Sequence, residues 1–260
     1  MNGVFITGSN TDVGKTTVGV EIIRHLSKTR KVKVRKPVET NCRLINETYT
    51  PKDAIALNEL CPEPEPLSVV CPYCFELEAS PEEASSHDGT TLSIDALVSA
   101  CNANTEDSFV VVEGAGGLYS PIADASLNSD LAKRLQVPIV IVIRDELGAI
   151  SQALLTIEAA KKNKLSVSCV VLNEIQSNNL CNKETFTAYT NFPVVSFSKK
   201  KLELLYSENE GLIYDSQVRF VGLLCGIFRI IKEHAFYILL LFNSKNSITM
   251  NKNVRRRKEK

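Results

Sequence analysis

A glycine-bounded loop near the start of the chain constrains the fold more strongly than any other feature. Residues 8–16 read Gly-Ser-Asn-Thr-Asp-Val-Gly-Lys-Thr and separate an apolar run, residues 4–7, from a helix-like run, residues 16–26. Strand, glycine loop, Lys-Thr and helix are the context of a phosphate-binding loop, whose backbone N–H groups face phosphate oxygens. Lys15 could then reach the outer phosphates, and the Thr16 hydroxyl could bind Mg²⁺. The position of the loop favours nucleotide binding over a tight turn without a ligand.

Short β-branched apolar runs alternate with helical patterns along the chain. The apolar runs are residues 4–7, 32–38, 109–112, 139–143, 167–172 and 193–197, and the helical patterns are residues 16–26, 94–103, 127–135 and 150–162. Such runs are typical of parallel strands buried on both faces. We therefore expect one α/β domain over residues 1–198, with a doubly wound, mostly parallel sheet like that of P-loop NTPases. Residues 39–92 hold six of the ten prolines and predict loops and short helices, one of them over residues 53–60.

The charges are unevenly distributed, although the formal net charge of the 260 residues is zero. Residues 199–260 contain 13 Lys and Arg against 6 Asp and Glu, which leaves 17 basic and 24 acidic residues in the remainder. An acidic body argues against nucleic acid as a partner. Residues 199–260 are expected to form a divergent, partly helical segment with a disordered basic tail, although the tail could also touch RNA or a membrane surface.

No targeting segment, membrane span or membrane partner is expected. The chain enters its first apolar run without a signal peptide, and charged residues interrupt the longest apolar stretch, residues 218–242. The eight cysteines are therefore expected to be thiols of a cytoplasmic protein. Cys71 and Cys74 form a C-x-x-C pair that could be redox-active or half of a zinc site, but no second pair of matching spacing accompanies it.

Four polar side chains stand where a sheet of this kind binds its ligands. Lys36, Glu113 and Asn173 end three predicted strands, and Asp53 begins a predicted helix. Each has an ordinary alternative. Lys36 could be an edge lysine, and Glu113 could belong to a tight turn. Asn173 could close a turn with its amide, and Asp53 could cap a helix. Because ligands bind at the carboxyl ends of parallel strands, the four residues and the glycine loop together predict one site for phosphate and Mg²⁺.

Seven short motifs follow one another along the chain. They are residues 8–16, Lys36-Pro37-Val38-Glu39-Thr40, Lys52-Asp53-Ala54, Pro72-Tyr73-Cys74-Phe75 with Ser80-Pro81, Val112-Glu113-Gly114-Ala115-Gly116-Gly117, Leu147-Gly148-Ala149-Ile150 and Leu172-Asn173-Glu174. Each motif is weak alone, whereas the set in this order is specific. The order is that of the dethiobiotin synthetase family, which the chain resembles over residues 1–197.

The resemblance implies a P-loop ligase that closes the ureido ring of dethiobiotin from 7,8-diaminononanoate, CO₂ and ATP. One amine would trap CO₂ as a carbamate, ATP would phosphorylate the carbamate, and the second amine would displace phosphate. The implied catalytic residues are Lys15 and Lys36, and the implied Mg²⁺ ligands are Thr16, Asp53 and Glu113. The residues implied to bind ATP are Asp12, Val13, Gly14, Lys15, Thr16, Thr17, Asp53, Glu113, Gly114, Ala115, Gly116, Asn173 and Glu174. Those implied to bind the diamine are Thr40, Gly148, Ala149, Ile150 and Ser151.

The resemblance also implies a homodimer in which the Gly148 motif of one chain lies near the diamine of the other. Four residues depart from the family pattern: Asn41 replaces a usual glycine, Glu82 a usual histidine, and Ser151-Gln152 a usual Asn-His pair. The usual Gly-Ile-Pro turn at the adenine site is also not visible in residues 196–199. Helix-start N–H groups at Gly148 and Ala149 could still bind the carboxylate of the substrate.

Two other functions share parts of this pattern. Switch ATPases of the partition and septum-site kind have this fold but carry a signature lysine early in the loop, where this chain has Asn10. Cobyrinate-type amide synthetases add a glutaminase domain with a catalytic cysteine, for which this chain is too short. Phosphate release that depends on the diamine and CO₂ distinguishes the first function from both.

Overall fold

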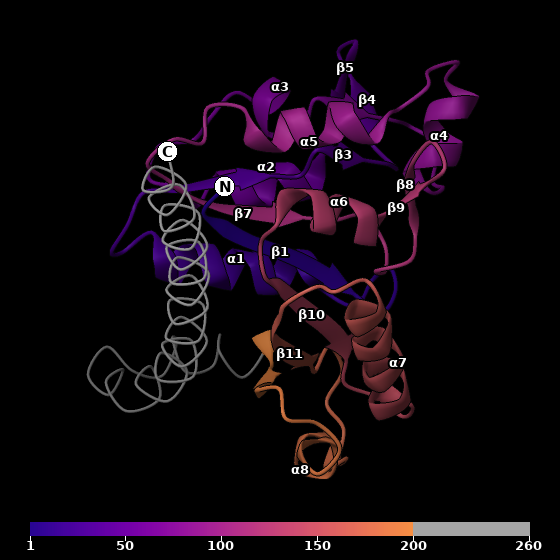
Figure 1. Ribbon diagram of the computed structural model, residues 1–260. Coiled ribbons are helices and arrows are strands. Elements are labelled where there is room, and N and C mark those ends of the chain that lie inside the picture. The colour runs from indigo at the N-terminus through magenta and orange to yellow at the C-terminus, as the bar shows by residue number, and fades with distance from the viewer. Residues whose placement is uncertain (200–260) are drawn as a thin grey trace, which may run out of the picture. The chain divides into compact units, whose positions relative to one another are not determined.

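The computed structural model describes residues 1–199, and what the sequence predicts for residues 200–260 lies outside the described residues. The central strands are β1 (Gly3–Gly8), β2 (Val32–Arg35), β7 (Phe109–Glu113), β10 (Ile139–Arg144), β11 (Val167–Asn173) and β12 (Val194–Phe197). They form a parallel six-stranded sheet in the order β12-β11-β10-β1-β7-β2 (Figure 1). The predicted doubly wound, mostly parallel α/β fold is therefore confirmed.

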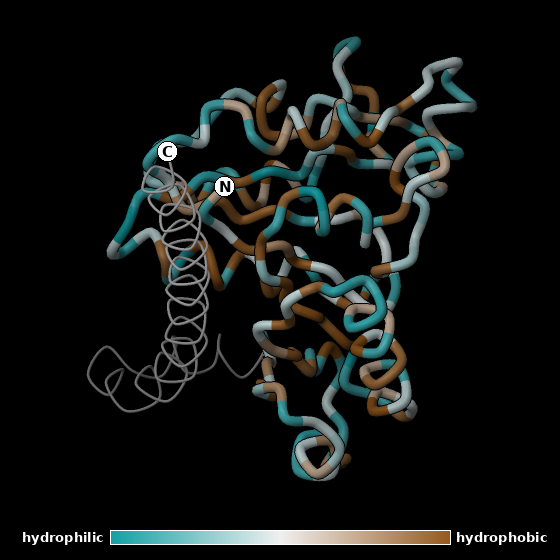
Figure 2. The backbone as a smooth tube through the Cα atoms, viewed as in Figure 1, coloured by the Kyte–Doolittle hydropathy of each residue, from teal (hydrophilic) through white to brown (hydrophobic). Residues whose placement is uncertain are grey.

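Helices cover both faces of this sheet. They are α1 (Lys15–Leu26), α2 (Lys52–Asn58), α3 (Leu67–Val70), α4 (Pro81–His87), α5 (Ile94–Asn102), α6 (Asn128–Leu135), α7 (Ala149–Lys162) and α8 (Asn182–Thr187). Side chains of α5, α6 and α7 form one buried cluster with Phe5 of β1. On the opposite face α1 packs on β1, where Gly19 lies against Ile6. Figure 2 shows the apolar residues concentrated along the central strands between these layers.

β1 lies where the winding of the sheet changes direction. The chain builds β1, β2 and β7 on one side and then β10, β11 and β12 on the other, so that β7 and β10 flank β1. In the strand register Ile6 pairs with Glu113, and Arg144 pairs with Asn173. Because all six strands are parallel, the phosphate loop, Glu113 and Asn173 reach the same carboxyl edge, where such sheets bind ligands.

The strand predicted over residues 32–38 is wrong at its end. β2 stops at Arg35, and β3 (Val38–Glu39) is a separate strand outside the central sheet. Pro37 has no N–H with which to continue a ladder, and the N–H of Lys36 donates to a carbonyl of α3 at 3.0 Å. The chain therefore turns at Lys36, which leaves this lysine at the carboxyl edge.

Residues 39–92 form short elements, as their prolines indicate. Besides α2, α3 and α4 they contain β6 (Tyr73–Cys74), which pairs with β3, and a hairpin of β4 (Arg43–Ile45) and β5 (Thr48–Thr50). A second hairpin, β8 (Pro121–Ala123) with β9 (Ser126–Leu127), follows β7. The helix predicted over residues 53–60 is α2. Within residues 1–199 no helix is long and apolar enough to cross a membrane.

Candidate active site

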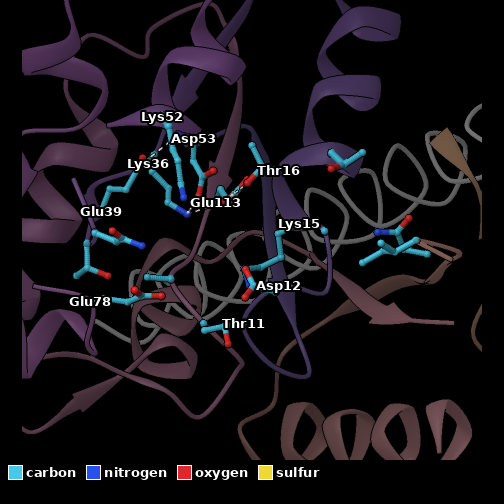
Figure 3. A pocket seen from close by; sticks show the side chains of 18 of the residues that line it. Thr11, Asp12, Lys15, Thr16, Lys36, Glu39, Lys52, Asp53, Glu78 and Glu113 are labelled. Atoms are coloured by element: carbon cyan, nitrogen blue, oxygen red, sulfur yellow. Dashed lines mark hydrogen bonds and ion pairs between the residues drawn. The ribbon is translucent and has the colours of Figure 1, made fainter. Parts of the chain in front are cut away.

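A pocket of about 700 Å³ opens at the carboxyl edge of the sheet (Figure 3). It brings together the phosphate loop, the turn after β2, the start of α2, the loop after β7 and the end of β11. The expected site residues that line it are Asp12, Gly14, Lys15, Thr16, Thr17, Lys36, Thr40, Asp53, Glu113, Ala115, Gly116, Asn173 and Glu174. The described lining does not include Val13, Gly114, Gly148, Ala149, Ile150 or Ser151.

The phosphate loop is supported by a side chain from β11. Gly14 has a φ of 86°, and a Cβ at this position would lie 2.0 Å from Nδ2 of Asn173, so only glycine fits. The same Nδ2 donates a hydrogen bond to the carbonyl of Val13 at 2.8 Å. Asn173 therefore holds the loop in place, and its contact with adenine stays a prediction.

Lys15 lies back over its own loop. Its Nζ donates to the carbonyl of Asn10 at 3.0 Å. Burial, and after it repulsion from Lys36, lowers the pKa of Lys15 to about 8. Phosphate oxygens beside Lys15 would supply the countercharge and raise the pKa again, so the loop is suited to an anionic ligand.

Lys36 is the centre of the charged cluster. Its side chain is only 4% exposed. Its Nζ lies 2.6 Å from Oε1 of Glu113, 3.5 Å from Oδ2 of Asp53 and 3.1 Å from the carbonyl of Gly114 (Figure 3). Burial lowers the pKa of Lys36, but the two carboxylates outweigh it and raise the pKa above its ordinary value. Lys36 is therefore a buried ammonium group with three acceptors, and the edge-lysine alternative is wrong.

The oxygen atoms around Lys36 fit a Mg²⁺ site. Oε1 of Glu113 also accepts a hydrogen bond from the Thr16 hydroxyl at 3.0 Å, and the Lys36 ammonium lies between Glu113 and Asp53 as a cation would. Within residues 1–199 no group of three or more His, Cys, Asp or Glu side chains could hold a metal ion by itself, so phosphates and water would have to complete the shell. One or two carboxylates and a hydroxyl are the protein ligands of a Mg²⁺ ion that shares its shell with phosphates and water.

Glu39 has a role that sequence reasoning missed. Its two carboxylate oxygens accept hydrogen bonds from the backbone N–H groups of Asp53 at 2.9 Å and Ala54 at 3.0 Å, which caps α2. Burial raises the pKa of Glu39, although these hydrogen bonds oppose the shift. Asp53 lies in the first turn, so the alternative that it is the helix cap is wrong; the cap position is Pro51, which offers no side-chain acceptor. A helix start without a capping side chain was the available signal. The other lining residues outside the expected set are Thr11, Asn41, Lys52, Glu78, Ala79, Ile175 and Lys199.

The departures from the family pattern have local explanations. Asn41 has a φ of 58°, a conformation that asparagine tolerates better than most residues other than glycine. Oε1 of Glu82 accepts a hydrogen bond from the N–H of Ala125 at 2.8 Å, which ties α4 to the β8–β9 turn. Oε1 of Gln152 accepts a hydrogen bond from the Ser9 hydroxyl at 2.8 Å, which ties α7 to the phosphate loop.

The start of α7 is buried on its inner side, where Ala149 is 0% exposed and Ile150 is half-buried. Gly148 precedes the helix with a φ of 93°. The N–H of Ala149 donates to a backbone carbonyl of the preceding turn at 3.0 Å, so the expectation that it is free to bind a carboxylate is wrong. Ser151 is exposed, and beside it Leu147 and Leu155 are 89% and 70% exposed. The turn before α7 and the outer face of its first half therefore present apolar side chains at the surface.

The C-x-x-C pair lies beside a third thiol. Sγ of Cys74 lies 3.7 Å from Sγ of Cys71. A hydrogen bond with Cys74, followed by burial, raises the pKa of the Cys42 thiol. The hydrogen bond with Cys42 lowers the pKa of Cys74, but the hydrogen bond with Cys71 and burial outweigh it and raise the pKa to about 12. The thiolate is the nucleophile in redox chemistry, so these pKa values disfavour a redox role.

We expect Cys42 and Cys74 to resist alkylation. At pH 8 iodoacetamide should label the exposed Cys181 at least about tenfold faster than either, because both thiols stay protonated. Peptide mass spectrometry over a time course measures each site, with the denatured protein as the control for intrinsic reactivity. Faster labelling of Cys74 than of Cys181 in the folded protein would reveal an activated thiol.

Comparison with known proteins agrees with the geometry of the pocket. Residues 2–197 match a protein-family model described as an AAA domain. Over 213 residues the chain is 47% identical to the ATP-dependent dethiobiotin synthetase BioD of Vesicomyosocius okutanii subsp. Calyptogena okutanii (strain HA), with 82% of this chain and 97% of that protein covered. It is 48% identical to the protein of the same name from Ruthia magnifica subsp. Calyptogena magnifica, with 78% and 93% covered.

A solved structure extends the comparison of the fold. The chain is similar to the MinC:MinD cell division protein complex of Aquifex aeolicus, with a TM-score of 0.52 and 16% identity over 89% of this chain and 96% of that chain. At this identity the likeness concerns the fold alone. It agrees with the parallel sheet described above.

Proposed function

We propose, since this chain belongs to the dethiobiotin synthetase family, that it closes the ureido ring of dethiobiotin by the steps that follow. The chain is an ATP-dependent dethiobiotin synthase. One amine of 7,8-diaminononanoate binds CO₂ as a carbamate, and a carbamate oxygen attacks the γ-phosphorus of ATP, with ADP as the leaving group. The second amine then attacks the carbonyl carbon of the carbamic-phosphoric anhydride, which closes the ring and releases phosphate.

The charges in the pocket support this reaction. A carbamate and a triphosphate are both anionic and repel each other, so the transfer needs cations between them. Lys36 would neutralise the carbamate and the γ-phosphate, and Lys15 would stabilise the transferring phosphoryl group. Thr16, Asp53 and Glu113 would hold Mg²⁺, which neutralises phosphate oxygens when bound.

The observation that carries the proposal is the link between Lys36 and the phosphate loop. Nζ of Lys36 and the hydroxyl of Thr16 bind the same atom, Oε1 of Glu113, at 2.6 and 3.0 Å. A second buried lysine at this point, from outside the phosphate loop, suits a second anion that reacts with the triphosphate. Such a transfer depends on placement and charge compensation and needs no protein nucleophile.

ATP turnover should require all the substrates together. With Mg²⁺ present, we expect phosphate release to rise at least about tenfold only when 7,8-diaminononanoate and bicarbonate are both added, because the phosphoryl acceptor forms from both. A coupled phosphate assay that omits each component in turn measures this, and mass spectrometry identifies the ring product. Turnover that is indifferent to the diamine would contradict the proposal.

A switch ATPase of the partition and septum-site kind is the alternative that the shared fold raises. The likeness in fold comes with only 16% identity. Asn10 stands where those proteins carry the signature lysine, and its carbonyl is the acceptor for Lys15. The alternative is therefore less well supported, and ATP turnover without a diamine is the result that would favour it.

We also propose a homodimer in which the start of α7 from one chain completes the diamine site of the other. Leu147 and Leu155 are 89% and 70% exposed, and burial against a second copy would remove this apolar area from water. A closed two-fold dimer brings the same surface of each chain together. The hydrogen bond between Ser9 and Gln152, at 2.8 Å, would connect that interface with the phosphate loop.

Leu155→Glu should separate the dimer. We expect the dissociation constant of the dimer, measured by sedimentation velocity, to rise at least about tenfold, because a charge would replace an apolar group that the interface would bury. Turnover should fall with the dimer fraction. Tyr189→Glu, which changes another exposed side chain, is the matched control and should leave both properties unchanged. A parent protein that is monomeric and fully active at the assay concentration would overturn the shared site.

A further inference from the structure

Asn128, the first residue of α6, is buried against the loop that follows β7. Its Nδ2 donates toward three carbonyl oxygens, those of Ala115 at 2.6 Å, Gly117 at 3.1 Å and Ser120 at 3.1 Å. Its Oδ1 accepts a hydrogen bond from the N–H of Ala115 at 3.1 Å. One side-chain amide therefore connects the beginning, the middle and the end of the loop.

The loop is packed tightly against this amide. A Cβ at Gly114 would lie 2.5 Å from Oδ1 of Asn128 and 2.9 Å from the ring of Phe5. A Cβ at Gly117 would lie 2.8 Å from the carbonyl oxygen of Ser9 in the phosphate loop. The two glycines thus allow the loop to lie between Asn128 on one side and the phosphate loop on the other, and a shift of the amide would displace the loop.

The end of β7 and the loop that follows it carry groups that face Lys36. Nζ of Lys36 lies 2.6 Å from Oε1 of Glu113 and 3.1 Å from the carbonyl of Gly114, and Ala115 lines the pocket. We propose that Asn128 is a positioning residue that fixes this loop and thereby the places of the Glu113 carboxylate and the Gly114 carbonyl. The inference rests on the proposed function, in which Glu113 holds Mg²⁺ and Lys36 neutralises the reacting anions.

The chemistry of an amide explains why asparagine is required. It presents a donor and an acceptor on one planar group, and the loop uses both. Aspartate has the same shape and keeps the acceptor for Ala115, but its second oxygen would face three carbonyl oxygens. A buried carboxylate in that place is disfavoured, so its pKa would be raised, and the protonated acid would regain one donor.

Asn128→Asp therefore gives a pH-dependent test. At pH 8.5 we expect Mg²⁺-dependent binding of a non-hydrolysable ATP analogue to weaken at least about tenfold and diamine-dependent turnover to fall at least about thirtyfold. Relative to the parent protein at each pH, both deficits should be at least about threefold smaller at pH 6, where the acid can donate. Calorimetry with the analogue needs no diamine, so this result is independent of whether the proposed reaction is correct.

Asn58→Asp is the matched control. Asn58 is also buried, and its amide binds both the carbonyl of Glu65 at 2.7 Å and the N–H of Glu65 at 3.1 Å, in a loop that does not line the pocket. This variant should lose stability without any pH-dependent change in nucleotide binding. Deficits of Asn128→Asp that are equal at pH 6 and pH 8.5, or binding within about twofold of the parent at pH 8.5, would overturn the inference.

A third variant covers the case in which Asn128→Asp does not fold at pH 8.5. Asn128→Ser shortens the side chain and adds no ionisable group, so its nucleotide binding relative to the parent protein should not recover at low pH. At pH 6 the folded Asn128→Asp protein should bind the analogue more tightly than Asn128→Ser does, because only the longer acid reaches the loop carbonyls. Equal binding by the two variants at pH 6 would overturn the inference.

Discussion

Lys36→Ala is expected to lower diamine-dependent turnover at least about a hundredfold while the affinity for Mg²⁺-ATP changes less than about threefold. Lys36 comes from the turn after β2 and lies beside the phosphate loop without belonging to it. Nucleotide binding would rely mainly on the loop N–H groups and Lys15. The charge that develops as carbamate and γ-phosphate meet would lose one of the cations that the proposal places beside it. The turnover number from phosphate release and the dissociation constant from calorimetry separate the two effects.

Two further lysine variants define what that result means. Lys36→Met keeps most of the volume and removes the charge, so it should be as inactive as Lys36→Ala if charge is the cause. Lys33→Ala is the matched control, because Lys33 lies on β2 and pairs with Glu65 at 3.2 Å, outside the pocket lining. It should keep its turnover. Near-parental turnover of Lys36→Ala would show that Lys36 only pairs buried carboxylates.

Glu113→Ala should also lower turnover at least about a hundredfold, and it should raise the Mg²⁺ concentration needed for half-maximal activity. The carboxylate accepts hydrogen bonds from both Thr16 and Lys36, and both Glu113 and Lys36 are buried. Without the Glu113 carboxylate, the Lys36 ammonium keeps its ion pair with Asp53. Breaking a buried ion pair on one side costs about 3 kcal/mol of unfolding free energy, which chemical denaturation measures. Asp53→Ala should shift the Mg²⁺ titration in the same direction.

Glu65→Ala separates the loss of stability from the loss of metal. Glu65 pairs with the buried Arg35 at 2.6 Å and with Lys33 at 3.2 Å, away from the pocket. Burial raises the pKa of Glu65, but its hydrogen bonds to these cations outweigh it and hold the pKa below the ordinary value. Glu65→Ala should therefore lower stability while the Mg²⁺ titration stays unchanged. An unchanged Mg²⁺ titration in both Glu113→Ala and Asp53→Ala would remove these carboxylates from the metal site.

The sheet and the general position of the site follow from short stretches of sequence. Apolar β-branched runs that alternate with helical patterns predict parallel strands. In such a sheet helices cover both faces, so side chains on both sides of a strand are buried and apolar. The carboxyl ends of parallel strands share one edge, so Lys36, Glu113 and Asn173 could be assigned to one site before their distances were known. The glycine loop before α1 predicts that this site binds phosphate, because the motif acts through local backbone geometry.

Contacts between distant residues could not be obtained in this way. Glu39 caps α2 with bonds of 2.9 and 3.0 Å only because β3 lies beside that helix. Asn128 reaches the loop after β7 because α6 begins against it, and Asn173 supports Val13 because β11 and the phosphate loop converge. Local patterns state which residues prefer a strand or a helix. Whether two polar groups come within hydrogen-bonding distance, about 3 Å, depends on how whole elements pack.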